Sequence, residues 1–222
     1  MPVRFHKCHG QNIRLLDNGE VSFRECSFAN GITFSEKPLQ PMEIFLIEIE
    51  KTERGWSGHL RIGLTQLNPS KHDKDLPQFA VPDLSEMGNT WVCAVSQSHN
   101  KVVDFEHEPV SIFGDGEYID TYSGSIHKSV LRASVKHRST CNNVLPTDVG
   151  SRIGIVYVIK NEMAEMHFII NGEDQGPCAK DIPYENGPLY AVIDVYGTTK
   201  QVRTIPLEGG IQVFISSHYL LT

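Results

Sequence analysis

The sequence has little of what marks a secreted, membrane-bound or nucleic-acid-binding chain. Its N-terminus lacks the apolar segment of a signal peptide, and no run approaches the roughly 20 apolar residues of a membrane span. The 20 Lys and Arg residues are outnumbered by 27 Asp and Glu, giving a formal net charge of -7 and no basic excess to neutralise phosphates. We expect no membrane insertion, no nucleic-acid partner and a cytoplasmic location.

Cysteine is also scarce. The five cysteines are an odd number, widely scattered and without a Cys-x-x-Cys pair, which excludes a disulfide framework. His6, Cys8 and His9 lie close together, but their spacing fits no usual pair of zinc ligands, because in a strand His6 and Cys8 share one face and His9 lies on the other. We expect no metal and no other cofactor.

Catalytic motifs are missing as well. A serine hydrolase needs a Gly-x-Ser-x-Gly turn around its nucleophile, and the segment YSGS at 122–125 does not supply one. Glu173 and Asp174 are paired carboxylates, but neighbours in a turn are normally solvated and keep ordinary pKa values. We therefore assign no catalytic residue and expect a protein that is not an enzyme.

What the sequence does contain is the period-two alternation of half-buried strands. With 222 residues, 40% of them hydrophobic, the chain is long enough to bury a full core as one domain. The segments 43–51 and 59–65 alternate clearly, and the polar turn between them predicts a hairpin. Further strands, rich in β-branched and aromatic residues, are expected at 90–95, 152–159, 166–171, 189–197 and 200–207. Short strands separated by Gly and Pro predict an all-β fold, an antiparallel β-sandwich.

The alternation fails over a long insertion at about 104–150. Within it, Ile126, Val130 and Ala133 recur at helix-like spacing, which favours one short helix. A surface loop without regular structure is an equal alternative, since connections this long are usually either functional or disordered.

The stretch MHFIINGEDQGP (166–177) contains two turn signals. Asn171 and Gly172 both tolerate positive φ, so they predict a tight corner after an apolar strand, and Gly176 allows a second bend. A phosphate-binding loop is disfavoured, because two carboxylates stand where the phosphate would lie. We expect the corner to join two core strands and to display Glu173 to Gln175.

Three motifs together resemble the neuralized homology repeat family. They are HGQNIRL at 9–15, WSGHLRIGLT at 56–65 and NGEDQGP at 171–177, and the likeness runs from about Phe5 to about Leu207. The resemblance implies a β-sandwich related to the SPRY type over residues 1–207, followed by a short tail at 208–222.

The resemblance also implies a function, which is to bind a protein substrate within a ubiquitin ligase. Family members join this module to a RING domain or to a SOCS box, and the SOCS box recruits elongin B and C and a cullin. The last cysteine is Cys178, so the tail at 208–222 lacks the Leu-x-x-x-Cys start of such a box. Partnership with elongin and a cullin is therefore expected only if a SOCS box is supplied. The alternative is a stand-alone interaction module that acts as a competitor or scaffold.

A recognition site is expected on loops at one end of the sandwich, because loops on a rigid scaffold vary without loss of the core. Trp56 is either an exposed binding residue or a lid over the core, and we favour the lid because the Trp-x-Gly pattern belongs to the family framework. Asp194 needs hydrogen-bond partners, for which Arg24 or Arg203 are candidates. The candidate substrate-binding residues are Arg54, Trp56, Lys71, His72, Asp73, Glu173, Asp174 and Gln175.

Overall fold

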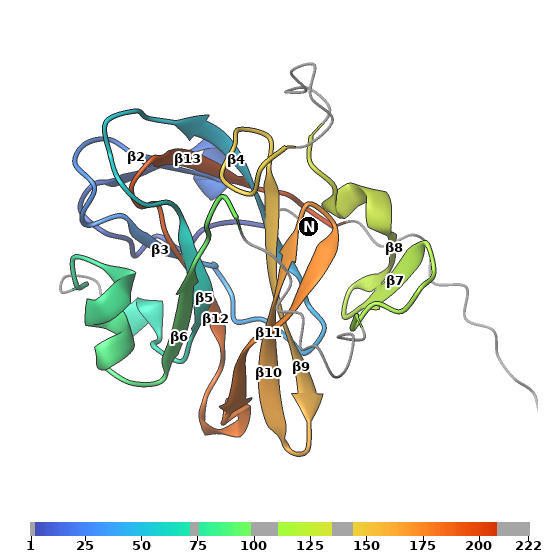
Figure 1. Cartoon of the computed structure of the whole chain (residues 1–222). Helices are drawn as coiled ribbons and strands as arrows, with labels where there is room; N and C mark the ends of the chain where they lie inside the picture. Colours follow the sequence, from blue (N-terminus) through green and yellow to red (C-terminus); the bar gives the residue numbers. More distant parts are fainter. Residues whose placement is uncertain (1–2, 72–75, 99–110, 135–143, 208–222) are drawn as a thin grey trace, which may run out of the picture.

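The computed structural model describes residues 3–71, 76–98, 111–134 and 144–207, and two antiparallel sheets dominate it (Figure 1). The larger sheet has seven strands in the order β1 (Ile13–Leu16), β2 (Val21–Arg24), β13 (Thr199–Thr204), β4 (Phe45–Thr52), β9 (Arg152–Lys160), β10 (Met163–Ile170) and β11 (Glu173–Ile182). The smaller sheet has four strands in the order β3 (Ile32–Phe34), β12 (Tyr190–Asp194), β5 (Arg61–Thr65) and β6 (Thr90–Ala94). These sheets confirm the predicted antiparallel β-sandwich.

Helical structure is limited to short turns among the described residues. The 3-10 turns are η1 (Asp17–Gly19), η2 (Pro69–Lys71), η4 (Lys128–Leu131) and η6 (Tyr184–Asn186), and η3 (Ala80–Leu84) is a single π-type turn. None of the described helices is long and apolar enough to cross a membrane. The predicted tail at 208–222 lies outside the described residues.

The main core lies between the two sheets and follows from the alternation of the strands. Every second residue of a strand points to the same face, so one face of each sheet supplies apolar side chains to the interior. The larger sheet contributes, among others, Ile47, Ile49, Ile153, Ile155, Met166 and Phe168, and the smaller sheet contributes Ile62, Leu64, Ala191 and Ile193. Burial of this many large aliphatic groups, at about 25 cal/mol per Å², is the main force that holds the sheets together.

The strands at 43–51 and 59–65 were predicted to form a hairpin, and this prediction is wrong. β4 pairs with β13 and β9 in the larger sheet, whereas β5 pairs with β12 and β6 in the smaller one. Residues 53–60 therefore cross from one sheet to the other. Alternation along a strand determines which face is buried but not which strand lies beside it, and here the two buried faces meet across the core.

The insertion contains a hairpin of β7 (Tyr118–Thr121) and β8 (Gly124–His127), followed by η4. Ile126 pairs with Ile119 in this hairpin, and Val130 is an exposed residue of the four-residue turn η4. The short helix expected within the insertion is thus the 3-10 helix η4, while Ile126, which the spacing placed on that helix, lies on β8. Ile119, Ile126 and Leu131 anchor the unit on the outer face of the larger sheet, against Leu46, Val156 and Ile169.

The corner at Asn171 and Gly172 is confirmed. Its two central residues have φ values of 52° and 93°, and Ile170 pairs with Glu173 across the β10–β11 hairpin. Positive φ at both central residues is the geometry that matches the twist of a hairpin, and Asn and Gly adopt it most readily. The Asn171 side chain also accepts a hydrogen bond from the backbone N–H of Arg152, which ties the corner to β9.

Candidate functional site

Four aromatic rings from four separate segments meet at one end of the sandwich. Phe28 lies in the loop between β2 and β3, Trp56 in the crossing between β4 and β5, Phe79 just before η3, and Tyr196 just after β12. The Phe28 ring centroid lies 5.2 Å from that of Trp56, 5.9 Å from that of Phe79 and 6.0 Å from that of Tyr196. We call these four residues the aromatic cluster.

The aromatic cluster faces solvent. Phe28 and Trp56 are each 37% exposed, while Phe79 and Tyr196 are half-buried beneath them. Neighbouring exposed aromatic rings on loops are the composition typical of energetically dominant residues in protein interfaces. The prediction that Trp56 lids the core is therefore wrong, and the alternative, an exposed residue available for binding, describes its position.

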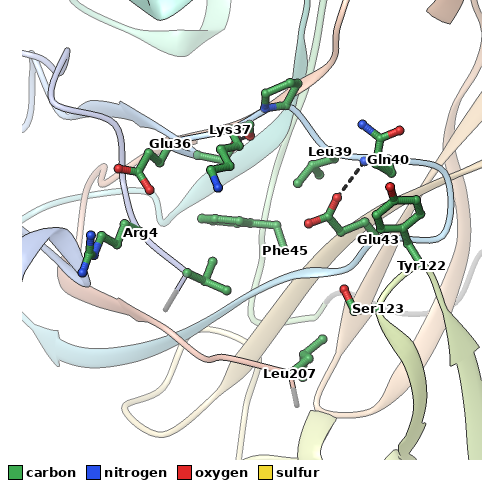
Figure 2. A pocket seen from close by; sticks show the side chains of 13 residues that line it. Arg4, Glu36, Lys37, Leu39, Gln40, Glu43, Phe45, Tyr122, Ser123 and Leu207 are labelled. Carbon is green, nitrogen blue, oxygen red and sulfur yellow. Dashed lines mark hydrogen bonds between the residues drawn. The ribbon is translucent and has the colours of Figure 1, made fainter. Parts of the chain in front are cut away.

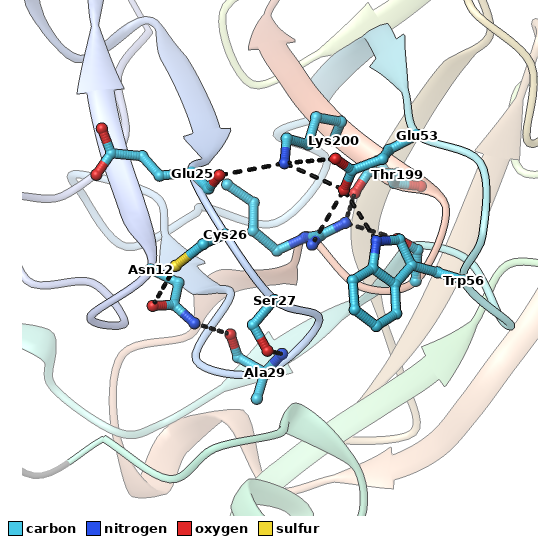
Figure 3. Close-up of polar contacts among 11 residues, drawn as sticks. Asn12, Glu25, Cys26, Ser27, Ala29, Glu53, Trp56, Thr199 and Lys200 are labelled. Carbon is cyan, nitrogen blue, oxygen red and sulfur yellow. Dashed lines mark hydrogen bonds and ion pairs between the residues drawn. The ribbon is translucent and has the colours of Figure 1, made fainter.

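A polar network fixes the orientation of Trp56 (Figure 3). Its indole Nε1 donates to Oε2 of Glu53 at 2.9 Å, and the Lys200 ammonium donates to both carboxylate oxygens of Glu53 at 3.0 and 3.1 Å. Lys200 also donates to the backbone carbonyl of Glu25, in the loop that carries Phe28. The hydrogen bonds from Lys200 and then Trp56 lower the pKa of Glu53, so this carboxylate stays ionised and holds the indole in place.

Two glycines allow the loop with Trp56 to lie against the loop with Tyr196. Gly58 and Gly197 have φ values of 79° and 61°. A Cβ on Gly58 would lie 2.7 Å from the Tyr196 ring, and a Cβ on Gly197 would lie 2.2 Å from the carbonyl oxygen of Gly58. The spacing of the Trp56-x-Gly58 motif is thus explained by close backbone approach, since only glycine fits both positions.

Arg61 supports the aromatic cluster from below. Its guanidinium carbon lies 3.7 Å from the centre of the Tyr196 ring, a cation–π contact, and its Nη1 donates to the carbonyl of Val81 at 2.7 Å. The Arg61 guanidinium contacts Tyr196, η3 and the end of β12. It therefore links the loops that carry the aromatic cluster to the smaller sheet.

Asp194 is the buried carboxylate beneath this surface. Its Oδ2 accepts a hydrogen bond from the backbone N–H of Ala80 at 3.0 Å and lies 3.7 Å from Nη1 of Arg61. Burial raises the pKa of Asp194 to about 6, because the Ala80 N–H and the charges of Arg61 and Arg24 only partly offset desolvation. Of the two predicted partners, Arg24 contributes its charge without an ion-pair contact to Asp194, and Arg203 binds acidic side chains elsewhere on the larger sheet.

The raised pKa of Asp194 predicts a pH dependence of stability. Between about pH 4 and pH 6 the folded chain keeps a proton on Asp194 that the unfolded chain releases. The stability that this bound proton gives the folded chain is fully present below that range and is lost as the pH rises through it. The shift from 3.8 to about 6 corresponds to about 3 kcal/mol. We expect the unfolding free energy of the Asp194→Asn variant to rise by about that amount relative to the unchanged chain from pH 4 to pH 7, measured in urea. A difference that is constant over this range would contradict the assignment.

The structure does not bring the predicted site residues together. Arg54 and Trp56 precede β5, whereas Lys71 is an exposed residue that follows it, so these positions lie at opposite ends of that strand. Among the other candidates, His72 and Asp73 lie outside the described residues. Glu173 is exposed and Gln175 is half-buried on β11, the outer strand of the larger sheet.

Asp174 was predicted to be a solvated carboxylate at the tip of the corner, and this is wrong. The residue is 7% exposed, and its side chain accepts hydrogen bonds from Nδ1 of His167 at 3.0 Å and from the backbone N–H groups of Ile112 and Gly176. Burial raises the pKa of Asp174, but these donors outweigh it and the net pKa is lowered. The alternation of β11 turns Asp174 inward, where it joins the insertion to the sheet.

Phe28, Phe79 and Tyr196 were not among the predicted site residues. Each is a single aromatic residue in an irregular segment, and the segments are far apart in the sequence. Only the position of Tyr196, directly after the apolar run of β12, offered a local signal. The cluster exists because four loops converge at one end of the sheets, which no spacing within one segment reveals.

A groove lies elsewhere on the molecule, away from the aromatic cluster (Figure 2). This groove has a volume of about 710 Å³, with Phe45 and Leu39 among its apolar lining. Charged side chains of both signs, Arg4, Lys37 and Glu43, also line it, so its electrostatics favour no single class of ligand. Over the described parts of the chain, no group of three or more His, Cys, Asp or Glu side chains is placed to hold a metal ion.

The fold defines this chain as a neuralized homology repeat domain. Residues 5–206 match the family model described as Neuralized, so the chain belongs to that family. It is 40% identical to mouse neuralized-like protein 2 over 228 aligned positions, which cover 95% of this chain and 79% of the relative, and 38% identical to the human protein of that name. It is 25% identical to mouse E3 ubiquitin-protein ligase NEURL3 over 91% of this chain and 61% of that protein.

Solved structures agree with the fold. The crystal structure of the NHR1 domain of Drosophila melanogaster neuralized superimposes with a TM-score of 0.66 at 21% identity, covering 93% of this chain and 99% of the other. The solution structure of the NHR domain of Neuralized from the same organism gives a TM-score of 0.63, also at 21% identity.

Proposed function

We propose that this chain is the substrate-recognition module of a cullin-type ubiquitin ligase complex and that it acts in the cytoplasm without catalysing a reaction itself. Membership of a family whose relatives include named E3 ubiquitin-protein ligases supports the ligase context. Such a module raises the local concentration of a protein substrate next to a charged ubiquitin-conjugating enzyme.

The observation that carries the recognition role is the aromatic cluster. Phe28 and Trp56 offer two exposed rings held by their neighbours rather than by the core, and the Glu53–Lys200 pair limits the movement of the indole. Because these rings are already ordered in the free chain, a protein segment that packs on them meets a small entropic cost. We propose that the bound substrate buries both rings.

The proposed surface predicts a specific loss of binding. Replacing Trp56 by alanine is expected to weaken the capture of ubiquitylation substrates at least tenfold, the effect of losing a typical interface hot spot of about 2 kcal/mol. Phe28→Ala is expected to act in the same direction, because the two rings contact each other. The measurement is quantitative mass spectrometry of proteins that bind the chain and whose ubiquitylation rises when it is expressed.

The matched control for this experiment is Tyr118→Ala. Tyr118 is 62% exposed, more than either cluster ring, but it lies on β7 in the hairpin that packs on the outer face of the larger sheet. This variant should retain the whole set of substrates. Equal losses from Tyr118→Ala and Trp56→Ala, or unchanged capture by Trp56→Ala, would show that the aromatic cluster is not the recognition surface.

The competing function is a stand-alone interaction module that binds the same proteins but recruits no ligase. Purification of the chain with elongin B and C and a cullin separates the two, since a stable complex formed with the tail at 208–222 intact would exclude the stand-alone module. The outcome is independent of Trp56, so recruitment and recognition are tested separately.

A further inference from the structure

Two cysteines on different sheets lie in contact. Cys93 belongs to β6, the outer strand of the smaller sheet, and Cys178 belongs to β11, the outer strand of the larger one. The Cys93 thiol donates to the backbone carbonyl of Cys178 over 3.8 Å, and the two thiols are close enough to perturb each other electrostatically. The Cys178 thiol also donates to the carbonyl of Met166 at 3.2 Å. The contact joins residues that are 85 positions apart in the sequence.

The two thiols differ in acidity, and Cys93 is the more acidic of the two. The interaction with the Cys178 side chain lowers the pKa of Cys93 to about 7, against the effect of burial. The interaction with Cys93 and burial both raise the pKa of Cys178. Near neutral pH a large share of Cys93 is therefore thiolate, the nucleophilic form, while Cys178 keeps its proton. Both residues are only partly buried, so a small oxidant reaches them.

We propose that Cys93 and Cys178 are a redox-active pair that forms a reversible disulfide between the two sheets when the chain meets hydrogen peroxide. In a disulfide the sulfurs are about 2.05 Å apart. The Cys93 sulfur already lies 3.8 Å from the carbonyl oxygen of Cys178, so rotation of the two side chains is the movement that brings the sulfurs together.

The reaction proceeds in two balanced steps. The Cys93 thiolate attacks one oxygen of hydrogen peroxide, the S–O bond forms as the O–O bond breaks, and the departing hydroxide takes up a proton to become water. The sulfur of Cys178 then displaces the hydroxyl group from the Cys93 sulfenic acid, which forms the S–S bond and, with the proton from Cys178, a second water. Two thiols are oxidised and one peroxide is reduced.

The cross-link acts on a strand that supports the aromatic cluster. Ala94, next to Cys93, pairs with Arg61, whose guanidinium stacks on Tyr196. Joining β6 to β11 therefore anchors the base of the cluster to the larger sheet through a second, covalent route. This inference does not depend on the ligase context, because it concerns two thiols and a peroxide.

Peroxide treatment of the full chain tests the proposal. Intact-mass measurement should show the loss of two hydrogen atoms, and digestion without reductant should release one peptide pair that joins Cys93 to Cys178. Dithiothreitol should reverse both changes. Closing a loop of 85 residues should also raise the melting temperature of the oxidised chain by roughly 5–10 °C.

Single-cysteine variants identify the order of the steps. Cys178→Ser should leave a sulfenic acid on Cys93 that dimedone traps, whereas Cys93→Ser should abolish both the trapped adduct and the cross-link. Cys26→Ser is the matched control, because Cys26 is exposed and lies on neither strand, and it should oxidise like the unchanged chain. Peroxide doses that oxidise Cys26 but produce no Cys93–Cys178 peptide pair would overturn the proposal, as would a cross-link that joins two chains instead of one.

Discussion

Replacing Arg24 by methionine is expected to lower the free energy of unfolding by about 3–5 kcal/mol, the typical cost of removing one partner from a buried charged network. The Arg24 side chain is fully buried, and its Nη2 donates to the carbonyls of Gly197 at 2.6 Å and Thr199 at 3.0 Å. Methionine keeps the apolar volume but leaves both carbonyls without this donor. It also removes the positive charge that faces Glu53 over 3.7 Å.

The environment of Arg24 explains why its loss is costly although its burial is unfavourable. Desolvation lowers the pKa of this guanidinium, and the nearby charges of Glu53 and Asp194 raise it only in part. The ionised side chain is thus held by the groups around it, and each of them is left uncompensated when it is removed. The loop around Gly197 carries Tyr196, so loss of Arg24 is also expected to loosen the aromatic cluster.

Urea unfolding followed by fluorescence measures this effect, with Arg14→Met as the matched control. Arg14 pairs with Glu25 at 3.4 Å, but its side chain is 65% exposed, and exposed ion pairs contribute between about 0 and 1 kcal/mol. Losses of similar size in the two variants would refute a special role for the buried arginine.

Replacing Gly63 by alanine is expected to lower the free energy of unfolding by about 3 kcal/mol or to prevent folding. A Cβ at Gly63 would lie 1.9 Å from the carbonyl oxygen of Trp91 and 2.7 Å from Cα of Val92. Both atoms are backbone of the neighbouring strand β6, so no side-chain rotation relieves the contact. β5 and β6 must separate, which breaks the hydrogen bonds between them.

Gly116→Ala provides the control, because a Cβ there meets its nearest atom at 3.7 Å, an ordinary van der Waals contact. Its melting temperature should stay close to that of the unchanged chain, while the Gly63→Ala variant should melt many degrees lower or be insoluble. A Gly63→Ala variant that melts with the control would mean that β5 and β6 do not pair as described.

The position of the aromatic cluster depends on the packing of the strands and loops beneath it, which Arg24→Met and Gly63→Ala both disturb. Arg24 holds the loop of Tyr196, and Gly63 sets the spacing of the strand that begins with Arg61. Both lie outside the exposed rings. Binding defects from them should therefore scale with lost stability, whereas the defect of Trp56→Ala should appear at full stability, because that indole is exposed and removed from the core.

Much of the fold could be predicted from local patterns. The strand segments were recognisable because alternation and β-branched residues are properties of each segment by itself, and the corner at Asn171 and Gly172 because two residue types favour one backbone geometry. The failed predictions concern relations between segments. The hairpin of 43–51 with 59–65 failed because the burial pattern of a strand is satisfied equally by a neighbour in its sheet and by a strand facing it across the core.

The candidate site was predictable only in outline. Loops at one end of a sandwich were expected, and Trp56 was among the candidates, but its partners Phe28 and Tyr196 were not. Asp174 was a candidate that the structure buries, because the sequence does not distinguish the two charged residues of the corner, Glu173 and Asp174. The strand that follows the corner turns one outward and the other into contact with His167.

The sequence by itself determined that this protein is an antiparallel β-sandwich of the neuralized homology repeat family. Strand alternation, turn residues and the three motifs each lie within one short stretch of the chain and can be recognised there. The tertiary structure alone decided that Phe28, Trp56, Phe79 and Tyr196 form one exposed cluster and that Cys93 meets Cys178. The physical reason is that hydrophobic burial is non-directional: it requires that each apolar face be covered, while the choice of which faces and loops meet is made by the packing of the whole chain.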